Sequence, residues 1–427
     1  MKIKPFHLHI FFLSLIAVYI FSFHYLPLQD FPQWIYHGHV FNQMVFHGND
    51  FGGYFSFHHY IPPNASATVL IGLLELPFSP MIAGKLFLFI SMILLYAGSW
   101  RVLTTLARSD HLLFAVISFS CCFNLFFYGG FLNFLFGLGI ALLGISYILD
   151  KRSNAALYLL MFFFLLCYLS HFASLLVLMV PVLSLILCDR NPKFVRKVLL
   201  ALLPSLVIFI HYYFTKDLAT LSPEGPGGQN YFYSLWGAIS HFPSTVMPFH
   251  RIRSVLESSL LEYLTNYPFA LFFIAGVMIF VVRALIKRDF SLLSTIGLIT
   301  TVLVIFSPTY LGGLFSIGQR FVILLWFVVV VYYFLQFPAP GLHLLETVAA
   351  GFVALFSFVM LWYGTALLNG MDIPAHTDSR THDARGGSNP FEHFHFYNDI
   401  EHNNGVPVFH SGLLDYKGAQ NEKPFDQ

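Results

Sequence analysis

The sequence predicts an all-α fold, a polytopic bundle of about eleven transmembrane helices. Of its 427 residues, 57% are hydrophobic and only 10% are charged, whereas a soluble domain carries about 25% charged residues. The mean hydropathy of +0.70 agrees with this composition. The apolar residues are also gathered in long runs, and a helix needs roughly 20 such residues to cross the hydrocarbon core of a bilayer.

The predicted spans follow one another with short connections over most of the chain. In chain order they cover residues 8–26, 82–106, 112–127, 131–149, 155–169, 172–187, 198–214, 269–286, 292–306, 321–335 and 345–368. The first run follows Lys2 and Lys4 but has no small-residue cleavage site after it. We therefore interpret it as a retained span and not as a signal peptide.

The basic residues indicate how the bundle is oriented. Lys and Arg in short loops favour the cytoplasmic side of a membrane. With the N-terminus in the cytoplasm, every basic loop cluster falls inside: Lys2, Lys4, Arg101, Arg108, Lys151, Arg152, Arg190, Lys193, Arg196, Lys197, Arg283, Lys287 and Arg288. The outer side receives Lys85, Lys216, Arg251, Arg253 and Arg320, with Arg380, Arg385, Lys417 and Lys423 of the tail. We therefore expect the C-terminus to be extracytoplasmic.

This orientation defines the domain organisation. A transmembrane domain, residues 1–368, has a first outer loop at 27–81 and a second at 215–268. The apolar segment 65–78 is short for a span, and counting it as one would move the basic clusters outside, so we interpret it as an outer amphipathic or re-entrant helix. The polar tail, 369–427, is rich in histidine: His376, His382, His393, His395, His402 and His410.

Asp30 is an isolated acid in "LPLQDFPQWIYHGHVFNQ", directly after the first span. Pro32 follows it near the start of a predicted helix at 33–46, a position where proline is tolerated. One interpretation makes Asp30 an N-cap that the helix dipole stabilises. The other makes it a general base or a metal ligand at the membrane surface. The sequence leaves both interpretations open.

Lys85 and Arg320 are predicted to open spans on the outer side, against the inside preference of basic residues. Both side chains are long enough to reach lipid headgroups by snorkelling. A sharper interpretation is that they bind the phosphate of a lipid substrate, Arg320 through its bidentate fork and Lys85 as a point charge. The predicted topology brings both to the same side of the membrane as Asp30.

Other polar candidates lie near the same side. His58, His59 and Asn64 belong to "FHHYIPPN". The histidines either anchor the loop at the interface or act as a proton shuttle, a donor to the substrate or a metal ligand. "NAS" at Asn64 also matches a glycosylation acceptor. Asn133, in "GGFLNFLFGLG", and His171, in "YLSHFASLL", lie near outer ends of spans. For the glycine-rich stretch we favour close helix packing, and for a lone histidine a hydrogen-bonded packing role.

Together these features resemble the GT-C superfamily of polyprenyl-phosphate-sugar-dependent glycosyltransferases. The resemblance extends over about residues 1–330 and rests on "LPLQDFPQW" with Asp30, on "YIPPNASATVLIGLLELPF", on Lys85 at the start of the second span, and on "QRF" with Arg320. It implies a GT-C-like bundle with membrane-parallel helices in the first outer loop and an active site on the outer face. It also implies residence in a bacterial inner membrane, within the cell envelope.

The resemblance further implies a mechanism. Asp30 would act as base in an inverting transfer of a hexosyl or pentosyl group, while Lys85 and Arg320 bind the donor phosphate. Its partners would be a lipid-linked sugar donor, membrane lipids, and a glycan, lipid or protein acceptor. The substrate-binding residues expected are Trp34, His37, His58, His59, Asn64, Asn133 and His171. No cofactor is expected. A divalent metal stays open, but Asp30 has no adjacent acidic partner, which argues against a metal-dependent variant.

Two other functions also fit the sequence. A transporter or flippase of a polyprenyl-linked sugar would use the same bundle and outer charges, although such proteins often contain internal repeats, and none is evident here. A non-catalytic component of envelope polysaccharide assembly would tolerate an inert Asp30. The net charge of +1 gives no support to nucleic-acid binding.

Overall fold

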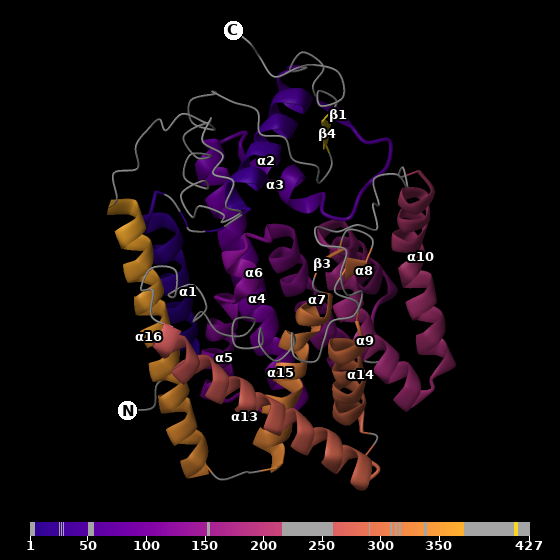
Figure 1. Ribbon diagram of the computed structural model, residues 1–427. Coiled ribbons are helices and arrows are strands. Elements are labelled where there is room, and N and C mark those ends of the chain that lie inside the picture. The colour runs from indigo at the N-terminus through magenta and orange to yellow at the C-terminus, as the bar shows by residue number, and fades with distance from the viewer. Residues whose placement is uncertain are drawn as a thin grey trace.

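The protein is described here by a computed structural model, in which nearly all of the regular structure is helical (Figure 1). The structure describes residues 5–24, 26, 28, 30–49, 55–151, 154–215, 259–289, 291–307, 310–311, 314–315, 317–336, 340–370 and 414–416. The tail and the second outer loop therefore lie largely outside the described residues. So do the sequence predictions made for them, including the tail histidines.

The helices follow the predicted apolar runs. They are α1 (Pro5–Ser22), α2 (Phe31–Phe46), α3 (Ser66–Leu74), α4 (Pro80–Ala107), α5 (Leu112–Cys122), α6 (Leu125–Tyr128), α7 (Leu132–Lys151), α8 (Leu157–Ser170), α9 (Phe172–Asp189), α10 (Pro192–Thr215), α13 (Ser259–Ile286), α14 (Leu292–Phe306), α15 (Ile317–Gln336) and α16 (Pro340–Gly370). Strand β1 (Phe55–Phe57) pairs antiparallel with β4 (Leu414–Tyr416), and β2 (Tyr310–Leu311) with β3 (Leu314–Phe315).

Within the described residues, six helical segments are long and apolar enough to cross a membrane by length and composition. They are α4, α7, α9, α10, α15 and the Glu346–Tyr363 part of α16. Shorter apolar helices occupy Phe6–Ser22, Leu112–Tyr128, Leu157–Ser170, Phe273–Ile286 and Leu292–Phe306. The chain is thus a helical membrane protein, and the total of about eleven crossings stays a prediction.

The predicted span at 112–127 is interrupted, because α5 ends at Cys122 and α6 begins at Leu125. Asn124 lies in the break and is fully buried. Its side-chain amide donates to the Cys121 carbonyl at 2.8 Å, and its Oδ1 accepts from the Phe127 amide at 3.0 Å. Asparagine side chains compete in this way with the backbone ladder of a helix. The prediction of one continuous helix here was therefore wrong.

The centre of the bundle is the packing of α7 against α4. A Cβ atom built on Gly98 of α4 would lie 2.8 Å from the carbonyl oxygen of Gly139 in α7. A Cβ atom on Gly139 would lie 2.7 Å from the Leu94 side chain. The two backbones approach this closely only because both positions lack a side chain. The interpretation of the glycine-rich stretch as a close packing surface is confirmed.

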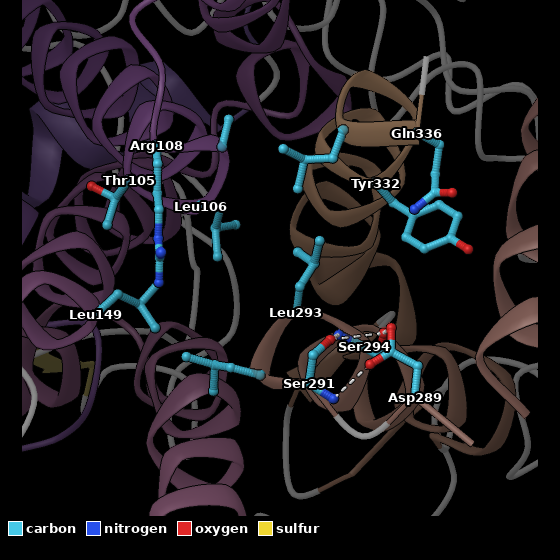
Figure 2. Close-up of a pocket in the computed structure, with 13 residues that line it drawn as sticks. Thr105, Leu106, Arg108, Leu149, Asp289, Ser291, Leu293, Ser294, Tyr332 and Gln336 are labelled. Atoms are coloured by element: carbon cyan, nitrogen blue, oxygen red, sulfur yellow. Dashed lines mark hydrogen bonds between the residues drawn. The ribbon is translucent and has the colours of Figure 1, made fainter. Parts of the chain in front are cut away.

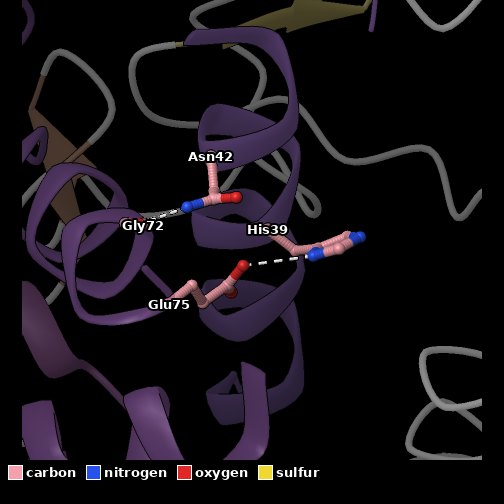
Figure 3. A network of polar contacts seen from close by, with 4 residues as sticks. All are labelled: His39, Asn42, Gly72 and Glu75. Atoms are coloured by element: carbon pink, nitrogen blue, oxygen red, sulfur yellow. Dashed lines mark hydrogen bonds and ion pairs between the residues drawn. The ribbon is translucent and has the colours of Figure 1, made fainter. Parts of the chain in front are cut away.

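Helices α2 and α3 lie together at one end of the bundle (Figure 1). They cross at Gly38 and Gly72, where a Cβ atom on Gly72 would lie 2.8 Å from the Gly38 carbonyl oxygen. Polar contacts reinforce this crossing (Figure 3): the Asn42 amide donates to the Gly72 carbonyl at 2.8 Å, and His39 Nδ1 lies 3.1 Å from Glu75 Oε2. The predicted helices at 33–46 and 65–78 thus form, the second one only over Ser66–Leu74.

Candidate functional site

Several of the predicted site residues meet where α7, α9 and α15 begin. Asn133 lies in the first turn of α7, His171 directly precedes α9, and Arg320 lies in the first turn of α15. Asn64 lies in the connection between β1 and α3. All these polar groups belong to one end of the bundle, the end on which α2 and α3 lie.

Arg320 forms the centre of this group. Its side chain is 5% exposed, and its Nη1 lies 3.1 Å from Nε2 of His171. The guanidinium carbon also lies 4.5 Å from the ring centroid of Phe134, 5.5 Å from that of Phe126 and 5.7 Å from that of Phe131. Aromatic faces attract a guanidinium through their quadrupole without neutralising its charge. A positive charge is therefore held inside an apolar and aromatic enclosure.

His171 makes two contacts that compete for one acceptor. Its Nδ1 lies 3.1 Å from the backbone N–H of Ala173 and caps α9, while its Nε2 faces Arg320. A neutral imidazole has one acceptor nitrogen and one N–H group. When Nδ1 accepts the capping bond, Nε2 carries the proton and directs it toward the guanidinium. Two donors are then in contact at 3.1 Å, and an anionic ligand bound beside the pair would stabilise them by accepting from both.

Asp30 occupies the N-cap position of α2, but its side chain makes no capping hydrogen bond. The prediction that Asp30 is the N-cap residue is confirmed, but the capping hydrogen bond from its side chain is not formed. The Asp30 backbone N–H donates to the Gly129 carbonyl at 3.1 Å. Gly130 has a positive φ of 68°, and a Cβ atom there would lie 2.6 Å from the Asp30 nitrogen.

The turn over residues 129–131 therefore joins Asp30 to Arg320. Gly129 and Gly130 contact the backbone of Asp30, and the ring of the next residue, Phe131, lies beside the Arg320 guanidinium. Asp30 is half-buried, whereas Arg320 is buried. The arrangement places an acid with access to solvent on one side of this turn and a buried cation on the other.

Asn133 ties the first outer loop to the bundle. Its Oδ1 accepts hydrogen bonds from Ser66 Oγ at 2.8 Å and from the Ala67 backbone N–H at 2.7 Å, and its Nδ2 donates to the Asn64 carbonyl at 2.9 Å. The Leu169 carbonyl accepts from the backbone N–H groups of Asn64 and Ala65. We therefore interpret Asn133 as a positioning residue, a role that differs from the substrate contact expected from the sequence.

Asn64 itself keeps a polar atom inside this loop. Its backbone is left-handed, with a φ of 91°, a conformation that asparagine adopts more readily than most residues. Its Oδ1 is buried and has no hydrogen-bond partner among the described residues. A buried carbonyl oxygen without a partner is costly, so Asn64 is a candidate acceptor for a ligand hydroxyl.

Trp34 and His37 lie on α2, with ring centroids 5.8 Å apart in an edge-to-face arrangement. Both side chains are buried, and Trp34 Nε1 and His37 Nδ1 have no hydrogen-bond partner among the described residues. Burial lowers the pKa of His37 to about 4, so the ring is neutral at pH 7. These groups lie two turns or less from Asp30 along the same helix, as expected for residues near one site.

Lys85, His58 and His59 have other surroundings. Lys85 is 7% exposed, and its Nζ donates to the carbonyl oxygen of Phe23, directly after α1, at 2.5 Å. An ammonium group at this position stabilises the C-terminal end of that helix. The His58 ring stacks on Tyr60 at a centroid distance of 4.6 Å, and Tyr60 packs against Tyr212 at 5.3 Å. His59 is exposed.

Sequence reasoning missed the aromatic enclosure of Arg320 and the turn at Gly129 and Gly130. The only signal for them was the segment "FFYGGFLNF", in which phenylalanines lie on both sides of two glycines that permit a tight turn. In the described part of the chain, no group of three or more His, Cys, Asp or Glu is arranged to hold a metal ion. Comparisons with protein-family models, curated proteins and solved structures gave no match.

Proposed function

We propose that the protein is an integral membrane glycosyltransferase of the GT-C kind, which transfers a sugar from a polyprenyl-phosphate donor to an acceptor hydroxyl. The observation that carries this proposal is the buried Arg320 guanidinium, which contacts His171 inside an aromatic enclosure and is joined to Asp30 by the turn at 129–131. A guanidinium in such surroundings favours an anionic phosphate as its ligand. The apolar helices around it fit the polyprenyl chain.

The proposed reaction is a single displacement. Asp30 takes the proton from the acceptor hydroxyl as its oxygen forms a bond to the anomeric carbon. The bond from that carbon to the donor phosphate breaks, and the electron pair leaves with the lipid phosphate. Arg320 stabilises the negative charge that develops on the leaving group. Attack from the face opposite the phosphate inverts the anomeric centre.

The proposal also includes a location and an orientation. With the N-terminus cytoplasmic, the end of the bundle that holds Asp30 and Arg320 is extracytoplasmic, where lipid-linked sugars are presented to glycan acceptors. The membrane is the bacterial inner membrane. Lys85 joins the donor site only if it exchanges its bond with the Phe23 carbonyl for a bond to phosphate.

The test is sugar transfer by membranes that contain the full chain, with a panel of radiolabelled polyprenyl-phosphate sugars. Asp30→Asn is expected to lower the rate by about 100-fold or more, the contribution of a general base. Arg320→Lys, which loses the planar fork, is expected to weaken donor binding. Asp110→Asn and Arg101→Lys change the same residue types near the other end of α4 and serve as matched controls.

Transfer by Asp30→Asn at the wild-type rate would refute the role of Asp30. The transporter would be favoured if the protein in reconstituted vesicles moves the lipid-linked sugar across the bilayer, no sugar reaches an acceptor, and Asp30→Asn leaves this movement unchanged.

A further inference from the structure

A pocket lies at the end of the bundle opposite Arg320. It has a volume of about 500 Å³ and is formed by the last turns of α4, α7 and α15 and the first turn of α14, with the loop before it (Figure 2). Gln336, at the end of α15, lines the pocket and comes sixteen positions after Arg320. At 1.5 Å per residue this is about 24 Å, close to the thickness of a bilayer's hydrocarbon core.

The pocket combines apolar and polar walls. Its apolar lining is mainly leucine: Leu106, Leu149, Leu292, Leu293 and Leu335. Its polar lining carries one cation, Arg108, and one anion, Asp289, together with the hydroxyl groups of Thr105, Ser291, Ser294 and Tyr332. A pocket of this composition at a membrane surface fits an amphiphile whose head carries both signs of charge.

Arg108 supplies the positive charge. It is the C-cap residue of α4, with a left-handed φ of 51°, and its side chain is exposed. Among the described residues, none forms a hydrogen bond or an ion pair with its guanidinium. The side chain extends along the wall that α4 forms, as Figure 2 shows. Guanidinium groups bind phosphate through two parallel N–H donors.

Asp289 supplies the negative charge on the opposite wall (Figure 2). Its Oδ1 accepts from the Ser291 backbone N–H and its Oδ2 from Ser294 Oγ, both at 2.9 Å. These hydrogen bonds, that of the Ser291 backbone first, lower the pKa of Asp289 and keep it ionised. Each carboxylate oxygen accepts more than one hydrogen bond, so an ammonium group can bind without displacing the serines.

We propose that this pocket binds the headgroup of a phospholipid that carries a primary ammonium, phosphatidylethanolamine, as a site separate from the proposed sugar-transfer site. The phosphate contacts Arg108, the ammonium contacts Asp289, and the leucines pack against the glycerol and the first acyl carbons. Phosphatidylglycerol has no cation for Asp289, so the carboxylate disfavours it. The charge pattern of the pocket thus selects a zwitterionic lipid over an anionic one.

The test is native mass spectrometry of the full chain in mild detergent, titrated with phosphatidylethanolamine or phosphatidylglycerol of identical acyl chains. The wild type is expected to retain phosphatidylethanolamine about tenfold better, the value of one charge-assisted hydrogen bond. Arg108→Asn, which tolerates the left-handed backbone, is expected to weaken both lipids. Asp289→Asn keeps an acceptor for the Ser291 N–H and is expected to abolish the preference.

Arg101→Asn and Asp110→Asn change the same residue types outside the pocket lining and are expected to leave retention unchanged. Wild-type retention of phosphatidylethanolamine by both pocket variants would overturn the proposal. Soluble glycerophosphoethanolamine, which lacks acyl chains, is expected to compete weakly. Competition by it at equal molar concentration would show that the site takes a free headgroup and overturn the assignment to a lipid. Folding of each variant is checked by its thermal midpoint.

Discussion

The clearest structural prediction concerns Asn133→Ala. The substitution removes three hydrogen bonds, of 2.7, 2.8 and 2.9 Å, and leaves the buried Ala67 N–H without its acceptor. Each bond contributes about 0.5–1.5 kcal/mol net, so the expected loss of stability is about 3 kcal/mol. The N-cap residue of α3, Ala65, has no capping side chain of its own. The loss should therefore appear first as loosening of α3 and of the loop before it.

The assay is hydrogen exchange by mass spectrometry on the full chain in detergent, with the thermal midpoint measured beside it. Asn133→Ala should raise exchange of the amides at residues 64–70. The matched control is Asn124→Ala, another buried asparagine, whose hydrogen bonds to Cys121 and Phe127 are local. It should lower the thermal midpoint without raising exchange at 64–70. Unchanged exchange there in Asn133→Ala would refute the positioning role.

Three further predictions concern the same end of the bundle. Gly130→Ala should be more destabilising than Gly48→Ala, because both have positive φ but only Gly130 would contact the Asp30 backbone; equal thermal midpoints would contradict this. Because the pKa of His37 is lowered, the unfolded chain takes up a proton between pH 6.5 and about 4 while the native state does not, which lowers the free energy of unfolding by about 3 kcal/mol over this range. Chemical denaturation at several pH values should show a smaller pH dependence of the free energy of unfolding for His37→Gln than for the wild type. An equal pH dependence in the two proteins would contradict this prediction. Burial raises the pKa of Glu75 although His39 opposes the shift, so the native state loses stability as pH rises from 4.5 through the folded pKa. Glu75→Gln should therefore be more stable than wild type at pH 8, and should lose this advantage near pH 4; an advantage that is independent of pH would refute the assignment.

Much of the fold is predictable from local sequence. The length of the apolar runs located most of the helices, and the tripeptide "DFP" located the start of α2 within a few residues. The break at Asn124 was missed because the run around it is mainly apolar. A single buried asparagine can nevertheless end a helix by bonding to the backbone. Its effect depends on its rotamer, which composition does not encode.

The site was predictable in its residue types and less so in their contacts. Charge patterning alone selected Arg320 and Lys85, yet the two differ in surroundings: aromatic rings and His171 enclose Arg320, whereas Lys85 binds the Phe23 carbonyl. That difference depends on how α1 packs beside α4, a long-range contact that a local pattern cannot specify. The joining of Asp30 to Arg320 through the turn at 129–131 is long-range for the same reason.

The proposed glycosyltransferase is tested most directly by locating a bound donor phosphate. The measurement is a cryo-electron microscopy structure of the full chain in nanodiscs with a polyprenyl phosphate added. The proposed function predicts phosphate density within hydrogen-bonding distance of Arg320 and His171, on the side that faces Asp30, and loss of that density in Arg320→Ala. Phosphate density elsewhere in the bundle, unchanged in Arg320→Ala, would contradict it.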